Sequence, residues 1–190
     1  AEDDYFIKSV DISILNRVED NGAIFYEDSI QVDPLVMLKQ NGINIVRLRL
    51  WHNPIENYSN LNDVLSIAER IKSEGLDLFL DFHYSDTWAD PSNQIKPIAW
   101  EGITFETLCD SLEEYSKHVI MKLKQQNTLP NYIQVGNETD CGFLLPEGYI
   151  CDSSDNEVQW DQLKKLYKHA IDGINEPLSD HDTVKNYFAC

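Results

Sequence analysis

The segment INIVRLRLW, residues 43–51, has the composition and alternation of a strand in a parallel sheet. Successive side chains of a strand point to opposite faces, so Arg47, Arg49 and Trp51 share one face. The other face carries the apolar residues Val46, Leu48 and Leu50. The pattern predicts a strand that packs against helices on its apolar side and directs charged and aromatic side chains to the opposite side.

The same unit, a strand followed by a helix, recurs along the chain. We expect strands at 6–13, 43–51, 76–84 and 132–138, and the start of a fifth strand within 182–190. We expect helices at 31–42, 60–75, 104–127 and 160–176. The first of these helices has Asp33 as a plausible N-cap, Pro34 in its first turn and Gly42 at its end. Strands that alternate with helices of this length predict a parallel sheet.

Two α/β architectures are compatible with such a sheet: a doubly wound open sheet and a (β/α)8 barrel. Neither G-x-G-x-x-G nor G-x-x-x-x-G-K-S/T follows an expected strand, which argues against the nucleotide-binding versions. No linker or low-complexity segment divides the sequence, so we interpret residues 1–190 as one domain.

Charge, apolar runs and cysteine spacing limit the partners, the location and the disulfide bonds that we expect for this protein. The 190 residues carry 15 Lys and Arg against 33 Asp and Glu, a net charge of −18, which argues against a nucleic-acid partner. No apolar run is long enough for a membrane span. The sequence starts at Ala1 without Met, as a processed export product would, so we expect a secreted, periplasmic or cell-surface protein. Among the four cysteines, Cys141 and Cys151 are close enough in sequence to pair within a loop.

Polar and aromatic residues gather at the carboxyl end of each expected strand. In chain order they are Asp11 and Ser13, then Arg47, Arg49 and Trp51, then Asp81 and His83, and finally Asn137 and Glu138. Enzymes with parallel sheets place their sites at this edge. A salt bridge explains any single Arg or Asp, but four strands that end in this way predict a site that includes Asp11 and Trp51.

Glycoside hydrolysis fits this set of residues best. In that chemistry one carboxyl group protonates the leaving oxygen while a second attacks the sugar or activates water. Trp88 and Trp100, in the long loop after the third strand, either stack on sugar rings or pack the loop. A metal hydrolase would draw its ligands from Asp81, His83, Asp86 and Glu138. Neither His-x-His nor H-E-x-x-H occurs, so we predict no metal site.

Five segments, in this order and spacing, resemble one family of glycosidases. They are FIKSVDIS (6–13), NIVRLRLWHNP (44–54), LDFHYSDTWADP (80–91), KPIAW (96–100) and IQVGNE (133–138). They are similar to the endo-β-1,4-galactanases, also called arabinogalactan endo-β-1,4-galactanases, of glycoside hydrolase family 53. The similarity extends to about residue 176, and LDFHYSDTWADP is its most specific part.

The resemblance implies a (β/α)8 barrel that hydrolyses β-1,4-galactan or arabinogalactan with retention of configuration, without a cofactor. It implies that Glu138 is the general acid/base, that Asn137 contacts the 2-hydroxyl group of the sugar, and that Arg47 supports the nucleophile. Further residues would line the sugar-binding cleft: Asp81, His83, Trp88, Asp90 and Trp100.

The sequence departs from the family pattern in two places. Ser9 stands where the family usually has Gly. The nucleophile of the family is a Glu at the end of the seventh strand, which this chain does not reach, and any calcium site of the family would also lie beyond it. We therefore expect the amino-terminal half of a barrel, roughly four β/α units, that is inactive alone.

A half-barrel also leaves sheet edges open at its first and fourth strands, which favours self-association between chains. The alternative to an enzyme half is a non-catalytic or vestigial protein that still binds galactan.

Overall fold

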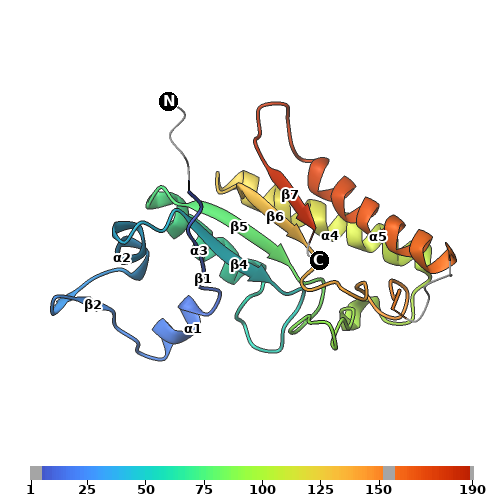
Figure 1. Ribbon diagram of the computed structural model, residues 1–190, viewed down its shortest axis with the longest axis horizontal. Coiled ribbons are helices and arrows are strands. Elements are labelled where there is room, and N and C mark those ends of the chain that lie inside the picture. Colours follow the sequence, from blue (N-terminus) through green and yellow to red (C-terminus); the bar gives the residue numbers. More distant parts are fainter. Residues whose placement is uncertain (1–5, 152–156, 189–190) are drawn as a thin grey trace.

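A five-stranded parallel sheet forms the centre of the molecule (Figure 1). The structure, a computed structural model, describes residues 6–151 and 157–188. The strands are β1 (Ser9–Asp11), β4 (Ile45–Leu50), β5 (Asp77–Phe82), β6 (Tyr132–Val135) and β7 (Lys185–Phe188). They lie in the order β1-β4-β5-β6-β7, so each strand after β1 is added beside its predecessor. This order confirms the predicted parallel sheet.

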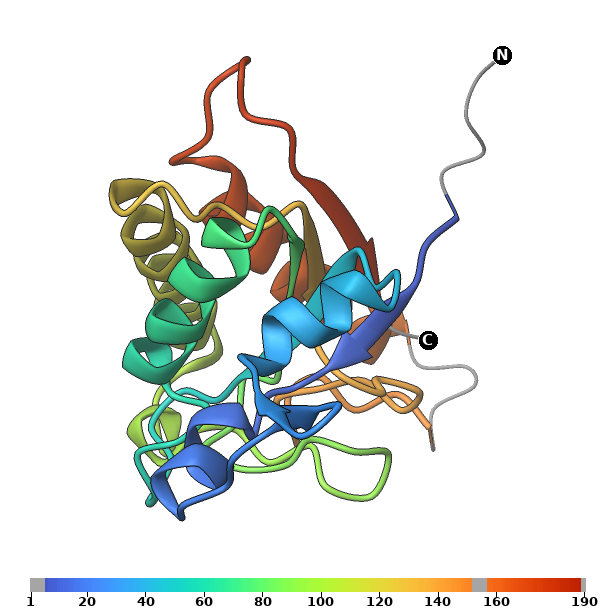
Figure 2. The same ribbon diagram turned by 90° about the vertical axis from the view of Figure 1, so that its left-hand side faces the viewer.

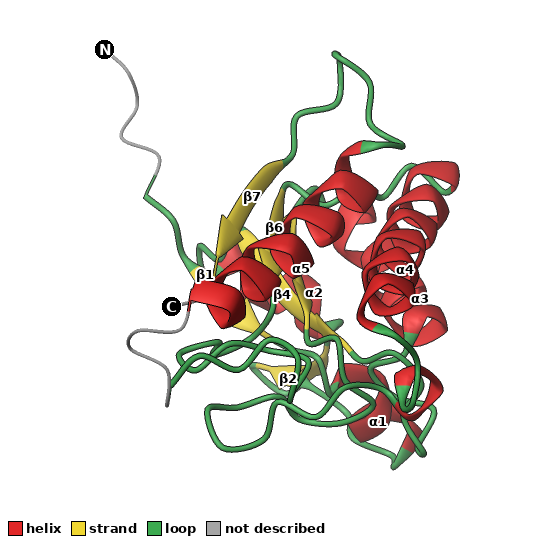
Figure 3. Cartoon of the chain, turned by 90° about the vertical axis from the view of Figure 1, so that its right-hand side faces the viewer, coloured by secondary structure: helices red, strands yellow, loops and turns green. Residues whose placement is uncertain are grey.

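Four helices follow the strands of the sheet. They are α2 (Pro34–Gln40), α3 (Leu61–Ser73), α4 (Phe105–Gln125) and α5 (Glu157–Asn175). Figure 3 shows α3 and α4 together on one side of the sheet, and Figure 2 shows β1 on the far side from them. All four helices and all five strands overlap the ranges that the sequence predicts.

Alternation along the strands separates the core from the open face of the sheet. Val46, Leu48 and Leu50 of β4 are buried in the hydrophobic core, as are Leu80 and Phe82 of β5. The in-register residues Arg47, Phe79 and Tyr132 are only partly buried on the other face. The predicted division of β4 into a helix-facing side and a polar side is therefore confirmed.

Side-chain caps set the starts of the helices. The Asp33 carboxylate accepts from the backbone N–H of Leu35 at 2.8 Å and caps α2, as predicted. Thr104 caps α4 in the same way, with its hydroxyl 3.2 Å from the backbone nitrogen of Thr107. Each cap satisfies an N–H group that the first helical turn leaves without a partner.

The segment between β1 and α2 contains elements that the sequence analysis does not predict. They are the short helix α1 (Leu15–Asp20) and a hairpin of β2 (Tyr26–Glu27) and β3 (Ile30–Gln31). Arg70 of α3 holds this segment in place, because its guanidinium bonds Glu19 at 2.7 Å and Asp33 at 2.9 Å. A contact between residues 51 positions apart leaves no local pattern in the sequence.

One of the two expected open edges of the sheet, the first strand, is confirmed, and the other is wrong. The fourth strand of the main sheet, β6, pairs with β7, so it is not an edge in this structure. Within the described residues, the strands with one neighbour in this sheet are β1 and β7. An uncovered strand edge presents backbone donors and acceptors to other chains, so we propose that the protein self-associates through these two edges.

Self-association through β1 is testable with one substitution. The N–H of Ile12 donates to the carbonyl oxygen of Arg47, so by alternation the N–H of Ser9 points away from β4. Ser9→Pro removes this edge donor and should weaken association, whereas the control Ser9→Ala should not. Light scattering after size exclusion should show a mass that rises with concentration for the unmodified chain. A constant monomer mass at all concentrations would contradict the proposal.

Candidate active site

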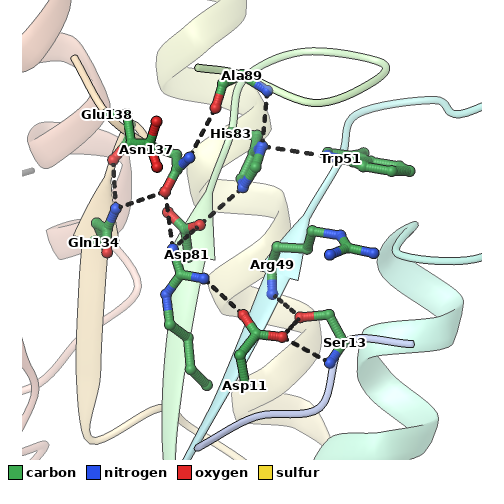
Figure 4. A network of polar contacts seen from close by, with 12 residues as sticks. Asp11, Ser13, Arg49, Trp51, Asp81, His83, Ala89, Gln134, Asn137 and Glu138 are labelled. Atoms are coloured by element: carbon green, nitrogen blue, oxygen red, sulfur yellow. Dashed lines mark hydrogen bonds and ion pairs between the residues drawn. The ribbon is translucent and has the colours of Figure 1, made fainter. Parts of the chain in front are cut away.

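The guanidinium of Arg47, from β4, joins side chains from three other strands or their ends, Asp11, Asp81 and Asn137. Figure 4 shows these three side chains pointing toward one another. Its Nη1 lies 2.6 Å from Oδ2 of Asp11, which ends β1. Its Nη2 lies 2.6 Å from Oδ2 of Asp81 in β5 and donates to Oδ1 of Asn137 at 2.9 Å. A planar group with several fixed N–H donors suits this task, because each donor reaches a different acceptor. The predicted cluster at the carboxyl ends of the strands therefore forms around Arg47.

Asp11 is fixed on both of its oxygens. Oδ1 accepts from the backbone N–H of Ser13 at 2.9 Å and from its hydroxyl at 2.6 Å, while Oδ2 accepts from Arg47. Burial raises the pKa of the Asp11 carboxyl, but the hydrogen bonds from Ser13 and Arg47 outweigh it and hold this pKa below its usual range. Asp11 is therefore a carboxylate that supports Arg47, with little freedom to move.

Asp81 and His83 form a fully buried pair beside Arg47. Nδ1 of His83 accepts from the indole N–H of Trp51 at 3.2 Å and from the backbone N–H of Ala89 at 3.1 Å. A nitrogen that accepts two hydrogen bonds carries no proton, so neutral His83 has its proton on Nε2. Nε2 lies 2.9 Å from Oδ2 of Asp81, although the alignment is poor for a hydrogen bond. Oδ1 of Asp81 has no hydrogen-bond partner among the described residues.

Asn137 is buried just beyond the end of β6 and is held at both ends of its amide. Oδ1 accepts from Arg47 and, at 3.2 Å, from Gln134. Nδ2 donates to the carbonyl oxygen of Ala89 at 2.7 Å. An Asn amide has two N–H donors, and within the described residues one acceptor, the Ala89 carbonyl oxygen, is found for them.

Glu138 lies next to this network but outside its hydrogen bonds. Its backbone has φ +48°, in the left-handed region that residues with a Cβ atom rarely adopt, and its side chain is exposed. Gly136, with φ +85°, makes the turn possible, because a Cβ atom there would lie 2.6 Å from Cγ2 of Thr139. Within the described residues, no hydrogen bond or ion pair of the Glu138 carboxylate is found. The turn thus directs one unpaired carboxylate away from the strand.

Two indole rings and a guanidinium form a wall beside the network. The Arg49 guanidinium lies 4.8 Å from the ring centroid of Trp51 and 4.2 Å from that of Trp88. Cation–π attraction of this kind fixes both rings. Trp88 remains 51% exposed, so it presents a surface on which a sugar ring can stack.

Trp100 and Asp90 lie outside the Arg47 network, and their place in the sugar-binding cleft stays a prediction. Trp100 is only 5% exposed, because it packs against His52 and Tyr115 at ring-centroid distances of 4.9 and 5.9 Å. In this structure Trp100 packs the loop, which is one of the two roles that the sequence allows for it. The Asp90 carboxylate caps its own turn by accepting from the backbone N–H of Ser92 at 2.9 Å, and it does not join the Arg47 network.

The loop after Glu138 is closed by a disulfide between Cys141 and Cys151. This pairing was an open possibility in the sequence, and the structure confirms it. Residue Gly142, inside the loop, has no room for a side chain, because a Cβ atom would lie 1.8 Å from the carbonyl oxygen of Gly148. The disulfide and this close contact keep the segment that follows the candidate acid compact.

The site offers hydrogen-bond donors and carboxylates but no metal-ligand cluster. In residues 6–151 and 157–188 no group of three or more His, Cys, Asp or Glu is arranged to hold a metal ion. The same residues contain no helix long and apolar enough to cross a membrane. The chemistry that the described residues support is proton transfer by an exposed carboxyl group beside fixed polar groups and an indole surface.

Comparison with known proteins decides the family. The model of "Glycosyl hydrolase family 53" matches residues 7–186. The chain belongs to glycosyl hydrolase family 53.

Named relatives and solved structures of family 53 agree with this assignment. An "Arabinogalactan endo-beta-1,4-galactanase" of Cellvibrio japonicus is 36% identical over 178 residues, which cover 93% of this chain and 46% of that protein. An "Endo-beta-1,4-galactanase" of Bacillus subtilis is 33% identical over 184 residues, 92% of this chain and 40% of that protein. The "Ignisphaera aggregans GH53 catalytic domain" superposes with a TM-score of 0.85 at 31% identity and covers 96% of this chain.

The match to family 53 also defines the architecture. The Ignisphaera aggregans domain is covered over 51% of its length, and the chain spans about half the length of the curated relatives that it matches. The parallel sheet and its helices therefore constitute part of a (β/α)8 barrel, as the sequence predicts. The competing doubly wound sheet is excluded.

The Arg47 network should dominate the stability of this part of the barrel. Arg47→Ala leaves the buried Asp81 carboxylate without its cationic partner, which should lower the free energy of unfolding by about 3 kcal/mol. The control is Arg17→Ala, which removes an exposed ion pair with Glu56 and should cost less than about 1 kcal/mol. Urea denaturation measures the free energy of unfolding of both variants. An equal decrease in the two would contradict the role of Arg47.

The disulfide should stabilise the loop that follows Glu138. Replacing Cys141 and Cys151 together by Ser should lower the free energy of unfolding by about 2–3 kcal/mol, because a closed loop of this length restricts the unfolded chain. Reducing agent should lower the stability of the unmodified chain to that of the double variant and leave the variant unchanged. Urea denaturation with and without dithiothreitol checks this, and an unmodified chain insensitive to reduction would contradict it.

Proposed function

We propose that this chain carries the acid/base half of an endo-β-1,4-galactanase site, with Glu138 as the general acid/base. The observation that carries the proposal is the contrast among the carboxylates at the strand ends. Asp11 and Asp81 are both tied to Arg47, whereas Glu138 is exposed and unpaired among the described residues. An acid/base must reach the glycosidic oxygen, and Glu138 is the carboxyl group in this cluster that is free to do so.

The neighbouring residues have roles that follow from their contacts. The second N–H of the Asn137 amide is available to a sugar hydroxyl, while the rest of that amide is fixed by Arg47 and Ala89. The exposed indole of Trp88 offers a stacking surface, and Trp51 and Arg49 hold it in place. The buried Asp81–His83 pair fixes the floor of the site.

The substrate proposal rests on the relatives. Proteins named arabinogalactan endo-β-1,4-galactanase and endo-β-1,4-galactanase share a third or more of their aligned residues with this chain. We propose galactan or arabinogalactan as the polymer that the site binds. The disulfide between Cys141 and Cys151 supports a secreted, periplasmic or cell-surface location, since such bonds persist in oxidising compartments.

We further propose that the 190 residues alone do not turn galactan over at the rate of a complete galactanase. Retaining hydrolysis needs a second carboxylate about 5–5.5 Å from the acid/base to act as nucleophile. In the described cluster, Asp11 and Asp81 are the other carboxylates, and Arg47 engages both. A protein that binds galactan without hydrolysing it is therefore the second candidate function for the chain by itself.

Two measurements on the purified chain test these proposals. Calorimetric titration with β-1,4-galacto-oligosaccharides should show binding, and Trp88→Ala should weaken it about tenfold by removing the stacking surface. The control is Trp160→Ala, which removes a partly exposed indole from α5. Chromatography of galactan digests should show no release of oligosaccharides above that of Glu138→Gln.

The possible results distinguish the proposals on galactan binding, on activity and on the role of Trp88. No binding by the unmodified chain would overturn the galactan site. Release of oligosaccharides that is lost in Glu138→Gln would overturn the proposed inactivity and support the role of Glu138. Equal weakening by Trp88→Ala and Trp160→Ala would remove Trp88 from the site.

A further inference from the structure

Gln94, which the sequence analysis does not identify, holds the backbone of the candidate acid. It lies in the loop between β5 and α4, and it is only 2% exposed. Its Nε2 donates to the carbonyl oxygen of Asn137 at 2.7 Å and to that of Glu138 at 3.0 Å. One carboxamide thus engages two consecutive peptide groups that are more than forty positions away in the sequence.

The loop that carries Gln94 is itself fastened to the segment around Glu138. The backbone N–H of Leu145 donates to the carbonyl oxygen of Gln94 at 3.0 Å, and Ile95 forms an isolated parallel bridge with Leu145. The carbonyl oxygen of Ala89 accepts from the Asn137 amide at 2.7 Å. The loop that carries Gln94 and the segment around Glu138 are therefore joined by several backbone contacts besides the two carboxamide bonds, so Gln94 is held close to the dipeptide that it contacts.

The geometry of these two bonds requires a bent backbone at Glu138. Consecutive carbonyl groups in a strand point to opposite sides, so a single NH2 group cannot reach both of them. Convergence of the carbonyls of Asn137 and Glu138 on Gln94 requires a bent, helix-like conformation at Glu138. The observed φ of +48° is a left-handed form of that bend, which a residue with a Cβ atom adopts only when its surroundings impose it.

We propose that Gln94 is a positioning residue that imposes the left-handed backbone of Glu138 and thereby directs its carboxyl group into the site. The consequence for catalysis rests on the proposed role of Glu138 as acid/base. The effect on the backbone does not, so the two can be tested separately.

The first experiment uses the 190-residue chain without any sugar. Backbone NMR chemical shifts of Glu138 distinguish a left-handed from an extended conformation, and they should report the left-handed form in the unmodified chain. Gln94→Met keeps the length of the side chain but removes both donors, so the shifts should move to values typical of negative φ. Unchanged shifts in a folded Gln94→Met chain would overturn the proposal.

A matched control is available at the end of α4. Gln126 also donates two hydrogen bonds from one carboxamide, to the carbonyl oxygen of Leu65 at 3.0 Å and to the Thr128 hydroxyl at 2.7 Å. Gln126→Met removes the same number of donors away from the site, and the Glu138 shifts should stay unchanged. Movement of these shifts in both variants would show a general loss of structure and would overturn the specific role.

The second experiment tests whether Gln94 acts through Glu138. Gln94→Met should weaken binding of β-1,4-galacto-oligosaccharides about tenfold when Glu138 is present, but only about twofold in the Glu138→Ala background. Equal weakening in both backgrounds would mean that Gln94 acts on the fold alone. If the unmodified chain binds no galactan, the proposed function fails, and the NMR experiment still decides the role of Gln94.

A second variant keeps the test decisive if Gln94→Met does not fold. Gln94→Glu is nearly isosteric, and its ionised carboxylate would repel the two carbonyls, whereas its protonated form has one O–H donor for them. Burial beside two carbonyls raises the pKa of this new carboxyl group, so the Glu138 shifts should leave the left-handed range at alkaline pH and return towards it as the pH falls. Shifts independent of pH would overturn the proposal, because a merely space-filling role predicts no such return.

Discussion

The rest of the site depends on the desolvation of Asp81. A carboxylate with no exposed surface is unfavourable unless a cation and hydrogen-bond donors compensate it, and Arg47 provides that compensation at 2.6 Å. The same guanidinium also reaches Asp11 at the end of β1 and Asn137 beyond β6. The relative positions of the strand ends, and hence the direction in which Glu138 leaves β6, follow from this one group. Its planar array of donors explains why Lys would not serve here.

The sequence predicts the frame of this site because the frame is periodic. Alternation in β4 separates Arg47 and Arg49 from the core residues Leu48 and Leu50, and the structure confirms this division. The same reasoning places Asp81 and Asn137 at neighbouring strand ends, where Arg47 joins them. Periodicity reports which face a residue occupies, so it is sufficient to predict a cluster at the ends of parallel strands.

Periodicity does not report contacts made by loops, and the features that the sequence does not predict lie there. Trp88 and Trp100 lie in the same long loop, and nothing in the sequence distinguishes their roles. In the structure the Trp88 side chain is half exposed, whereas the Trp100 side chain is buried against His52 and Tyr115. The sequence does not identify Gln94 as a site residue, because its hydrogen-bond partners are backbone carbonyl groups of residues far along the chain. The residues that flank the hairpin between β1 and α2, Glu19 and Asp33, are likewise held by ion pairs with Arg70, which lies too far along the chain to leave a local pattern. Loop geometry depends on the assembled sheet, so it can be interpreted only after the sheet is known.

The pairing of the charged groups at the strand ends explains why Glu138 stands apart. Arg47 is engaged by the carboxylates of Asp11 and Asp81, and Arg49 lies over the rings of Trp51 and Trp88. Among the described residues, neither guanidinium is therefore paired with the Glu138 carboxylate. The backbone of Glu138 is fixed by Gln94 while its carboxyl group is left to solvent. A rigid main chain with a side chain that has no partner among the described residues suits the proposed role of Glu138 as proton donor, because the position of such a group must be defined while its proton remains free to transfer.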